Sequence, residues 1–485
     1  MVRKFAPRVT KVRPWLVLLV PFATVGQAQP PAVAPPPATE KAAPAEPKAQ
    51  PGDPAAAAEA NPLADAATAQ KSSEVEVFKD PRADKVLPNT FPELKAPANF
   101  RGDPGRYSDF DEMRSMSGGG TPDREKIQRY VEYFAAELSS RKNIKALMDP
   151  NAFASTVPVG RRSAEVRAID RATSALLDPL VTAREARNQA FVDAYSRALL
   201  TTLPKLLEGQ FFSRIQAMIV LGTLGSPDAI DLAIKQLNDP EQVIWVKLWA
   251  ARGITGATQE GRVELRDQQK GFAAAKALVE FLAREPEAPW PAQVRALEAL
   301  GSLRLANLPL PPTPDMAAAA LARLADVNAK LDVRAWAGWA LGMMRVGPQV
   351  SNYNYALIAY HLGLAAAAIG DRIATDTSST AQEAQRLTGL LLYQIYPAFK
   401  GEQGVRSSGL LAIQGAGLPP TARPLSEQIT ALALAAVDVT RSANTQLPAK
   451  RAAVAAKVAE LRAFLEKNKP KEDALVPGGP KFTGP

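Results

Sequence analysis

The chain has 485 residues, 46% of them hydrophobic and 22% charged, which is enough sequence for about three domain-sized units. It contains no Cys and a single His, His361, which excludes thiol catalysis, disulfides, iron–sulfur clusters and zinc sites made of Cys and His. The formal charge of +9 would favour nucleic-acid binding only if the basic residues were clustered on one surface.

The first 28 residues have the layout of a secretory signal peptide. They contain five basic residues and no acidic one, and the basic residues precede the apolar run 15–20. This run continues only to about Val25 and is shorter than the roughly 20 residues that span a bilayer. Small residues before position 29 predict cleavage after Ala28, so we expect an exported protein with no membrane-spanning segment left. The alternative is an N-terminal anchor that is not cleaved. The basic residues are Arg3, Lys4, Arg8, Lys11 and Arg13.

Loss of these five charges lowers the formal balance from +9 to +4, with both signs dispersed along the remaining chain. We therefore expect no nucleic-acid partner. A chain that is exported without Cys is more typical of a bacterial periplasm than of a small disulfide-stabilised secreted domain. The expected location is therefore periplasmic or extracellular, in a bacterial envelope.

Residues 29–120 are predicted to be a disordered linker and an irregular segment. Ten prolines lie within residues 30–62, interleaved with Ala, Glu and Lys. Such a composition favours extended polyproline-like conformations and cannot bury a core. The segment would tether the folded part, and a spacer that contacts cell-wall polymer is an alternative. Residues 73–120 have scattered apolar residues and no periodicity, so they could also lie over the folded body.

Helical signals begin at Thr121, which we expect to cap a helix that has Pro122 at its first position. Apolar residues then recur at spacings of three and four, here and in two further helices at about 164–177 and 187–200. Residues 121–207 are therefore predicted to form N-terminal helices. No convincing strand pattern occurs up to Lys469, and Ala and Leu dominate, so the fold class is predicted to be all-α.

Residues 208–370 repeat one design, in which an apolar helix ends in small residues and a second helix follows. The stretch RIQAMIVLGTLGSPDAI at 214–230, followed by LNDP at 237–240, resembles a HEAT repeat. VRALEALG at 294–301 and VRAWAGWALG at 333–342 resemble the first helices of further copies, and a weaker copy near 242 has Lys247 in place of Arg. The resemblance implies an α-solenoid, because such hairpins bury their apolar faces only by stacking.

The connections inside the later copies are longer than in the first copy. The predicted loops are 255–269 and 304–313, and we expect equivalent turns to emerge on one edge of the array, where binding surfaces are often built. C-terminal helices are expected in residues 371–469, at about 385–396, 426–440 and 448–468, and the last of them would cap the array. Residues 470–485 are predicted to be a disordered tail.

Catalytic motifs are absent from the sequence: it has no phosphate-binding loop, no nucleophile elbow and no dinucleotide fingerprint. Asp109, Asp111 and Glu112 could touch calcium, but a solvated acidic patch explains them better. We therefore expect no catalytic residue, no metal and no cofactor, and hence a protein that is not an enzyme.

Aromatic residues give the one candidate binding site. Trp and Tyr combine apolar area with a polar group, which suits recognition of a protein or a sugar. The five Trp residues after position 28 lie within the repeats, and a cluster of Asn and Tyr follows the last copy. The alternative is that these residues fill the space between helices. The candidate binding residues are Trp339, Tyr353, Asn354, Tyr355, Tyr360 and His361.

The function expected from these features is that of an exported, non-catalytic scaffold or binding protein that contacts another envelope protein. One alternative is a helical-toroid enzyme of the polysaccharide-lyase type, because Asn352, Tyr353, Tyr360 and His361 supply the residue types that such enzymes use. Another alternative is a structural subunit of a surface layer.

Overall fold

The structure is a computed structural model, and it describes residues 80–86, 91–98, 100, 109–148, 167–259, 267–308, 312–375, 381–413, 417–442 and 444–482. These residues belong to one compact unit that begins at Asp80. The predicted signal peptide, residues 1–28, and the proline-rich linker up to residue 79 lie outside the described residues. Within the described residues the fold is all-α. Every regular element is a helix, and β-pairing is limited to two isolated bridges.

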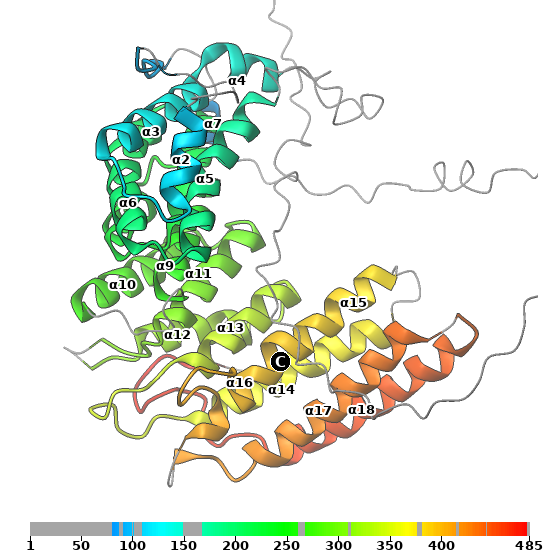
Figure 1. Cartoon of the computed structure of the whole chain (residues 1–485). Helices are drawn as coiled ribbons and strands as arrows, with labels where there is room; N and C mark the ends of the chain where they lie inside the picture. The colour runs from blue at the N-terminus through cyan, green and yellow to red at the C-terminus, as the bar shows by residue number, and fades with distance from the viewer. Residues whose placement is uncertain are drawn as a thin grey trace, which may run out of the picture. The chain divides into compact units, whose positions relative to one another are not determined.

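The helices follow one another along the chain as Figure 1 shows. Those before the repeats are α1 (Ala83–Val86), α2 (Asp109–Ser117), α3 (Arg124–Ser139), α4 (Arg141–Met148), α5 (Ala168–Glu185), α6 (Gln189–Thr202) and the 3-10 helix η3 (Leu203–Glu208). The repeats contain α7 (Phe211–Leu224), α8 (Ile230–Asn238), α9 (Ile244–Gln259), α10 (Gln268–Arg284), α11 (Trp290–Leu303), α12 (Asp315–Ala325), α13 (Leu331–Met343) and α14 (Tyr355–Thr375). The C-terminal elements are α15 (Ala381–Leu390), the π-helix η5 (Leu391–Ile395), α16 (Tyr396–Lys400), the 3-10 helix η6 (Leu410–Ala412), α17 (Ala422–Arg441) and α18 (Leu447–Lys467).

The repeat helices form two layers of stacked hairpins. In one layer α7 packs on α9, α9 on α11 and α11 on α13. In the other layer α8 packs on α10, α10 on α12 and α12 on α14. Each hairpin thus buries its apolar face against its neighbours, as the sequence pattern predicts.

Small residues set how closely the first-layer helices approach. Gly222 of α7 lies against Gly253 of α9, and a Cβ placed on Gly222 would be 3.0 Å from the carbonyl oxygen of Trp249. Gly301 of α11 faces Trp339 of α13, and Gly342 of α13 faces Ala398 of α16. The glycines near the helix ends therefore allow the backbone contacts on which the stacking depends.

The N-terminal helices pack on one another and on α7, the first helix of the repeats. Helix α3 packs between α5 and α6, and the buried Tyr130 and Tyr195 donate hydrogen bonds to the carbonyl oxygens of Ala175 and Leu176, at 3.0 and 3.1 Å. Asp123, and not the predicted Thr121, caps α3, because its carboxylate accepts from the N–H groups of Glu125 and Lys126.

The prediction of disorder for residues 29–120 is wrong for its described C-terminal part. Asp80 is buried, α1 lies next to it, and α2 buries Met113 and Met116 against the N-terminal helices. The carboxylate of Asp80 accepts from the N–H of Ile244 at 2.6 Å, at the start of α9. Local periodicity could not reveal the order around Asp80, because its partner Ile244 is 164 positions away, whereas α2 packs on the nearer helices α3, α5 and α6.

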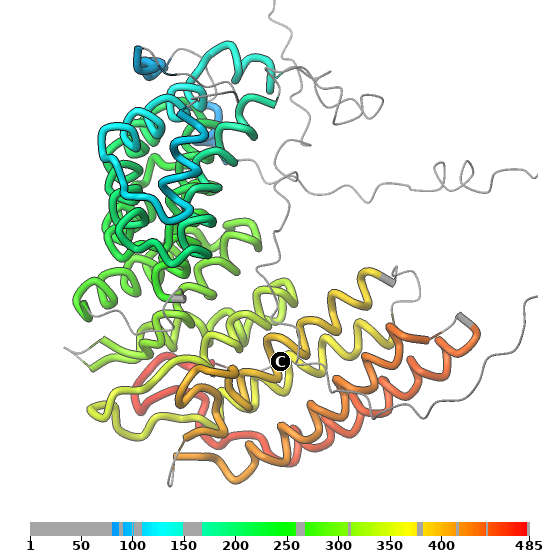
Figure 2. Tube along the Cα trace, in the orientation of Figure 1, coloured from blue at the N-terminus to red at the C-terminus, as the bar shows by residue number. Residues whose placement is uncertain are grey.

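The prediction of a disordered tail is also wrong, for residues 470–482. They fold back so that Leu475 is fully buried and Phe482 nearly so, and Ala474 and Lys481 form an antiparallel bridge. Figure 2 shows this C-terminal segment running beside the loop that precedes α14, and the N–H of Asn354 donates to the carbonyl oxygen of Leu475 at 2.8 Å. The tail is polar and rich in Gly and Pro, so its order comes from its two buried apolar side chains and from the hydrogen bonds that its backbone makes with Asn354.

The C-terminal helices α17 and α18 pack on each other and on α14, at the end of the stack (Figure 1). Among the described helices, α14 alone has the length and apolar composition to cross a membrane, but 72% of its most apolar window is buried inside the fold. It is the core helix of this end of the unit.

Candidate binding site

Three connecting segments meet on one edge of the unit, and we call them the loop edge: residues 304–308, 344–354 and 401–413. The N–H of Arg345 donates to the carbonyl oxygen of Arg304 at 2.9 Å, and the N–H of Gly409 donates to that of Gly342 at 2.7 Å. The guanidinium groups of Arg304 and Arg345 both donate to the carbonyl oxygen of Arg406, at 2.5 and 2.8 Å. These bonds hold the three segments together without regular secondary structure.

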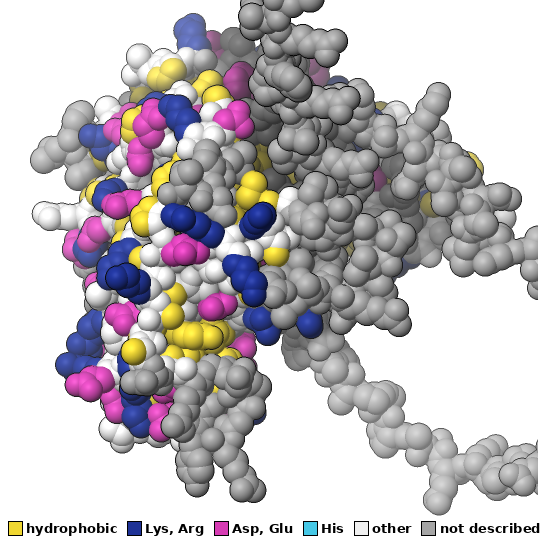
Figure 3. Space-filling view, turned by 90° about the horizontal axis from the view of Figure 1, so that it is seen from above, with side chains coloured by type: hydrophobic (Ala, Val, Ile, Leu, Met, Phe, Trp, Pro, Cys, Tyr) yellow, Lys and Arg dark blue, Asp and Glu magenta, His cyan; other side chains and the backbone are white. Residues whose placement is uncertain are grey.

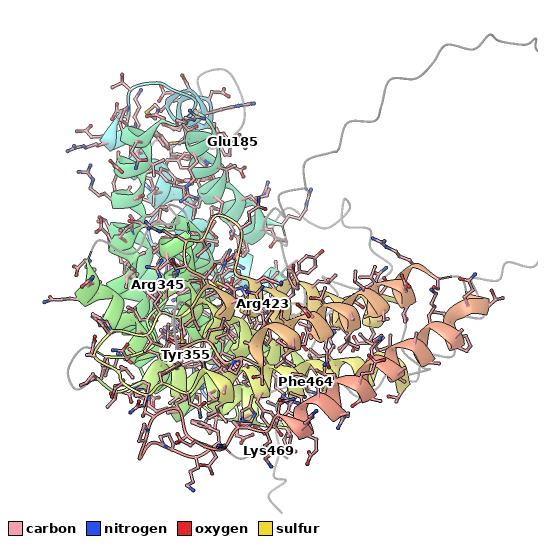
Figure 4. All side chains as sticks on the ribbon, turned by 90° about the horizontal axis from the view of Figure 1, so that it is seen from below. Glu185, Arg345, Tyr355, Arg423, Phe464 and Lys469 are labelled. Atoms are coloured by element: carbon pink, nitrogen blue, oxygen red, sulfur yellow. The ribbon has the colours of Figure 1, made fainter. Side chains whose placement is uncertain are left out.

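An open pocket of about 440 Å³ lies at the loop edge. Its wall comes from the loop between α13 and α14, from the first residue of α14 and from the segment before α17. Figure 4 marks Tyr355, where α14 begins, and Arg345 in the loop before it. The lining residues are Val346, Gly347, Pro348, Val350, Asn352, Tyr353, Tyr355 and Gly417.

Two tyrosines and one asparagine supply the polar groups of the pocket. The rings of Tyr353 and Tyr355 make an edge-to-face contact with centroids 4.7 Å apart, an arrangement that the ring quadrupoles favour. Burial raises the pKa of both phenols above the ordinary value, so both stay protonated and able to donate. Within the described part of the chain, neither hydroxyl has a hydrogen-bond partner, nor does the side-chain amide of Asn352.

The backbone at Asn352 turns the chain into the pocket. Its φ of 55° lies in the left-handed region, which Asn tolerates better than most residues. This turn lets Tyr353 and Tyr355 face the same cavity on either side of Asn354. The loop between α13 and α14 thus presents its polar groups to solvent because Asn352 has a left-handed backbone conformation. The sequence pattern did not indicate this conformation.

Asn354 is committed to the fold. Its side-chain oxygen accepts from the N–H of Leu357 at 3.0 Å, which caps α14. Its amide nitrogen donates to the carbonyl oxygens of Glu472 and Ala474, both at 3.1 Å. The same side chain therefore starts α14 and holds the C-terminal tail, and it does not line the pocket.

The other three predicted binding residues lie in the core. Trp339 is 6% exposed and fills the contact with Gly301, and Tyr360 is 8% exposed on α14. His361 is 1% exposed, and neither ring nitrogen has a hydrogen-bond partner among the described residues. Burial lowers its pKa to about 4, an effect that the nearby backbone of Phe482 partly offsets and the charge of Arg334 reinforces.

The structure thus brings together Tyr353 and Tyr355 and separates them from Trp339, Tyr360 and His361. The lyase-type alternative needs Asn352, Tyr353, Tyr360 and His361 around one substrate, but only the first two line the pocket. The lining residues that the sequence-based prediction missed are mainly small or apolar and come from a loop with no periodic pattern. Gly417 could not be foreseen, because it comes from a segment more than 60 positions away.

The predicted loop 255–269 does not contribute to the pocket. Its first residues continue α9, where Thr255 and Thr258 are buried and donate to backbone carbonyl groups one turn earlier. Residues 260–266 lie outside the described residues. The loop is shorter than predicted because α9 continues to Gln259.

A second polar cluster joins the segment after residue 79 to the repeats. Arg82 pairs with Asp80 at 2.8 Å and with Glu285 at 2.5 Å, and Glu285 also pairs with the buried Lys247 at 2.9 Å. Burial works against the charge of Glu285, but its two cationic partners hold the pKa below the ordinary value. Burial lowers the pKa of Lys247, and Glu285 offsets only part of this effect. The two cationic and two anionic side chains balance in charge, and their pairs link the segment at Asp80 to the repeats.

The surface charge is mixed. On the described face seen in Figure 3, Lys and Arg side chains alternate with Asp and Glu side chains. Among the described residues, no group of three or more His, Asp or Glu side chains could hold a metal ion.

Comparison with known proteins gives no further assignment, since no family model, no curated protein and no solved structure matches this chain.

Proposed function

We propose that this chain is an exported helical-repeat protein of the bacterial envelope that binds another protein and has no catalytic activity of its own. The observation that carries the proposal is the pocket at the loop edge, where two phenols and one amide are accessible and have no hydrogen-bond partner in the described chain. Polar groups of this kind, next to aromatic rings on a fixed scaffold, favour recognition by a partner.

The HEAT-like interpretation of the repeats is part of this proposal. Arg214, Lys247 and Arg334 are each the fourth residue of the first helix of their hairpin, and Arg295 is the sixth residue of its helix. Two stacked layers of helices and close-packed glycines at the ends of these first helices also agree with it. Repeat arrays of this type use extended surfaces for binding, which supports a scaffold role.

Export is proposed from the sequence of residues 1–28, and the N-terminus of the natural protein tests it. Protein purified from its own envelope fraction should begin near Gln29 when its N-terminal sequence is determined. A chain that still begins at Met1, or that is found only in the cytoplasm, would contradict the proposed location.

The binding role can be tested with a photo-crosslinking amino acid at Tyr353 in the full chain. The control is the same amino acid at Leu434, which is 61% exposed on α17. We expect a covalent adduct with an envelope protein from position 353 that is absent from position 434. Equal adducts from both positions would indicate nonspecific contact and would contradict the proposal.

The captured protein must then bind through the two tyrosines. Replacement of Tyr353 and Tyr355 together by Ala should cost at least about 2 kcal/mol of binding free energy, as expected for interface hot spots. The helical circular-dichroism melt of the same variant reports the stability. A large loss of stability with unchanged binding would show that the tyrosines serve only the fold.

The alternatives have less support from the geometry. A lyase would need a base at the substrate, and His361 is buried away from the pocket lining. No observation on the described surface favours a surface-layer subunit.

A further inference from the structure

The pocket at the loop edge is electrically neutral. None of its lining residues is charged, since all are aliphatic, aromatic, Gly, Pro or Asn. Arg345 precedes Val346, but its guanidinium group donates to the carbonyl oxygen of Arg406. A charged ligand group buried in this pocket would find no opposite charge among the lining residues to compensate for its lost hydration. The pocket therefore favours a neutral ligand or a neutral segment of a larger one.

The polar side chains of the pocket can both donate and accept hydrogen bonds. The phenols of Tyr353 and Tyr355 are protonated and each offers one O–H, the amide of Asn352 offers two N–H groups, and the three side-chain oxygens can accept. A carboxylate, which would accept from the hydroxyl groups of a sugar, is missing from the lining. A ligand surface rich in carbonyl acceptors can use all four of these donor hydrogens, and it needs few acceptors from the pocket because it has few donors of its own.

A polyproline II segment has this surface. Its backbone carbonyl groups make no internal hydrogen bonds and point to solvent, and each Pro removes a backbone donor. The walls formed by the Tyr rings, Val346 and Pro348 suit the apolar pyrrolidine rings between these carbonyl groups. Aromatic-lined grooves with hydroxyl donors bind proline-rich segments in this way because the ligand is already extended and loses little entropy.

The pocket is also fixed before a ligand arrives. Asn354, between the two tyrosines, is held at its backbone N–H by Leu475 and at its side chain by Glu472, Ala474 and Leu357. The N–H of Gly347 donates to the side-chain oxygen of Asn307 at 2.8 Å. A site held from both sides loses little conformational entropy on binding.

We propose that the Tyr353–Tyr355 pocket binds a proline-rich, extended segment of the partner protein. This inference rests on the proposed function, because it names the kind of segment that the partner would present. The partner is a separate protein, and sugars and other copies of this chain are outcomes that the test distinguishes.

The test is calorimetric titration of the full chain with decaproline, compared with a Gly-Ser peptide of equal length and with a neutral oligosaccharide such as chitotetraose. Tyr353→Phe and Tyr355→Phe remove one hydroxyl each and keep the rings, so the fold is preserved. The matched control is Tyr393→Phe, at a tyrosine that is 54% exposed on η5 and outside the pocket. We expect decaproline binding that weakens about three- to tenfold in each pocket variant and is unchanged in the control.

Any of three results of the titration would overturn the inference: no decaproline binding up to about 1 mM, binding that neither pocket variant weakens, or preference for the oligosaccharide. A molar mass that doubles with protein concentration and falls when decaproline is added would assign the pocket to another copy of this chain, and would also overturn the inference.

If crosslinking at Tyr353 captures a partner through a segment without proline, the proposed function stands and this inference fails. If no specific partner is captured, the proposed function fails as well.

Discussion

At the scale of single residues, the core of this protein contains polar side chains whose charge or hydrogen bonding depends on the fold. His361 has neighbours on α13 and in the C-terminal tail, and Asp80 lies at the start of α9. Both are buried, so protonation of His361 or loss of the partners of Asp80 should change the free energy of unfolding.

His361 should make the protein less stable in mild acid. Its pKa is about 4 in the folded state and about 6.5 in an unfolded chain. Between these values the unfolded chain binds the extra proton, so stabilisation is complete above pH 6.5 and is lost as the pH falls towards 4. The loss should approach about 3 kcal/mol.

Urea unfolding of the wild type and of His361→Leu at pH 7.5 and pH 4.5 measures this contribution. The two chains have the same carboxylates. The difference between the pH dependences of their free energies of unfolding is therefore the contribution of the histidine. Identical pH dependences would show that His361 is protonated as easily in the folded as in the unfolded state.

Asp80 should anchor the N-terminal segment to the repeats. Asp80→Asn removes the charge that pairs with Arg82 and weakens the bond to the N–H of Ile244. Loss of one partner from a buried ion pair typically costs about 3–5 kcal/mol. Chemical unfolding gives the total cost, and amide exchange of residues 80–86 should accelerate.

The control for this variant lies in the same segment. Lys85→Gln breaks the exposed ion pair with Glu241, and such pairs contribute little to stability because water and salt screen them. If the two variants lose equal free energy of unfolding, the buried pair of Asp80 contributes no more to stability than the exposed pair of Lys85, and the prediction is wrong.

At the scale of elements, helix packing here depends on glycines that no side chain can replace. Gly342 of α13 meets the backbone of Ala398 in α16, and a Cβ at Gly342 would be 2.5 Å from the carbonyl oxygen of Ala398. Backbone atoms cannot rotate away, so the two helices would have to separate.

Gly342→Ala should therefore destabilise the protein by about 1–3 kcal/mol, the usual cost of overpacking. Gly389→Ala is the matched control, since Gly389 also lies in a helix but its Cβ would have no neighbour closer than 3.7 Å. It should stabilise the protein by about 0.5–1 kcal/mol through helix propensity. Thermal unfolding of both variants measures the difference, and equal shifts would contradict the packing argument.

At the scale of the folded unit, the C-terminal tail links the last helices to the pocket. Removal of residues 470–485 would expose the surfaces that Leu475 and Phe482 cover and would free the amide of Asn354. We expect a loss of about 3–6 kcal/mol in the free energy of unfolding, from the burial of two large apolar side chains. We also expect faster amide exchange at the start of α14. An unchanged melt would show that the tail packs without stabilising the fold.

The dispersed charge predicts weak binding to nucleic acids. Without clustered Lys and Arg, few counterions are released on contact with a duplex. Fluorescence anisotropy with labelled DNA at about 150 mM salt should show no submicromolar binding. Tight binding under these conditions would mean that basic residues gather on a surface that the chain pattern does not indicate.

The sequence by itself determined the helical fold class and the stacking of helical hairpins. Apolar residues at helical spacing, as in residues 211–221, and small residues such as Gly222 and Gly342 near the helix ends encode both features. These signals are local or recur along the chain, so they can be recognised without knowing which residues meet in space.

Only the tertiary structure decided which polar and aromatic residues are accessible. Tyr353 and Tyr360 are only seven positions apart, yet one lines the pocket and the other is buried in α14. The tail around Leu475 and the segment at Asp80 gain their order from contacts with residues more than 100 positions away. Such order depends on long-range burial and hydrogen bonding, which compensate for the entropy lost by an irregular segment and leave no periodic pattern in its sequence.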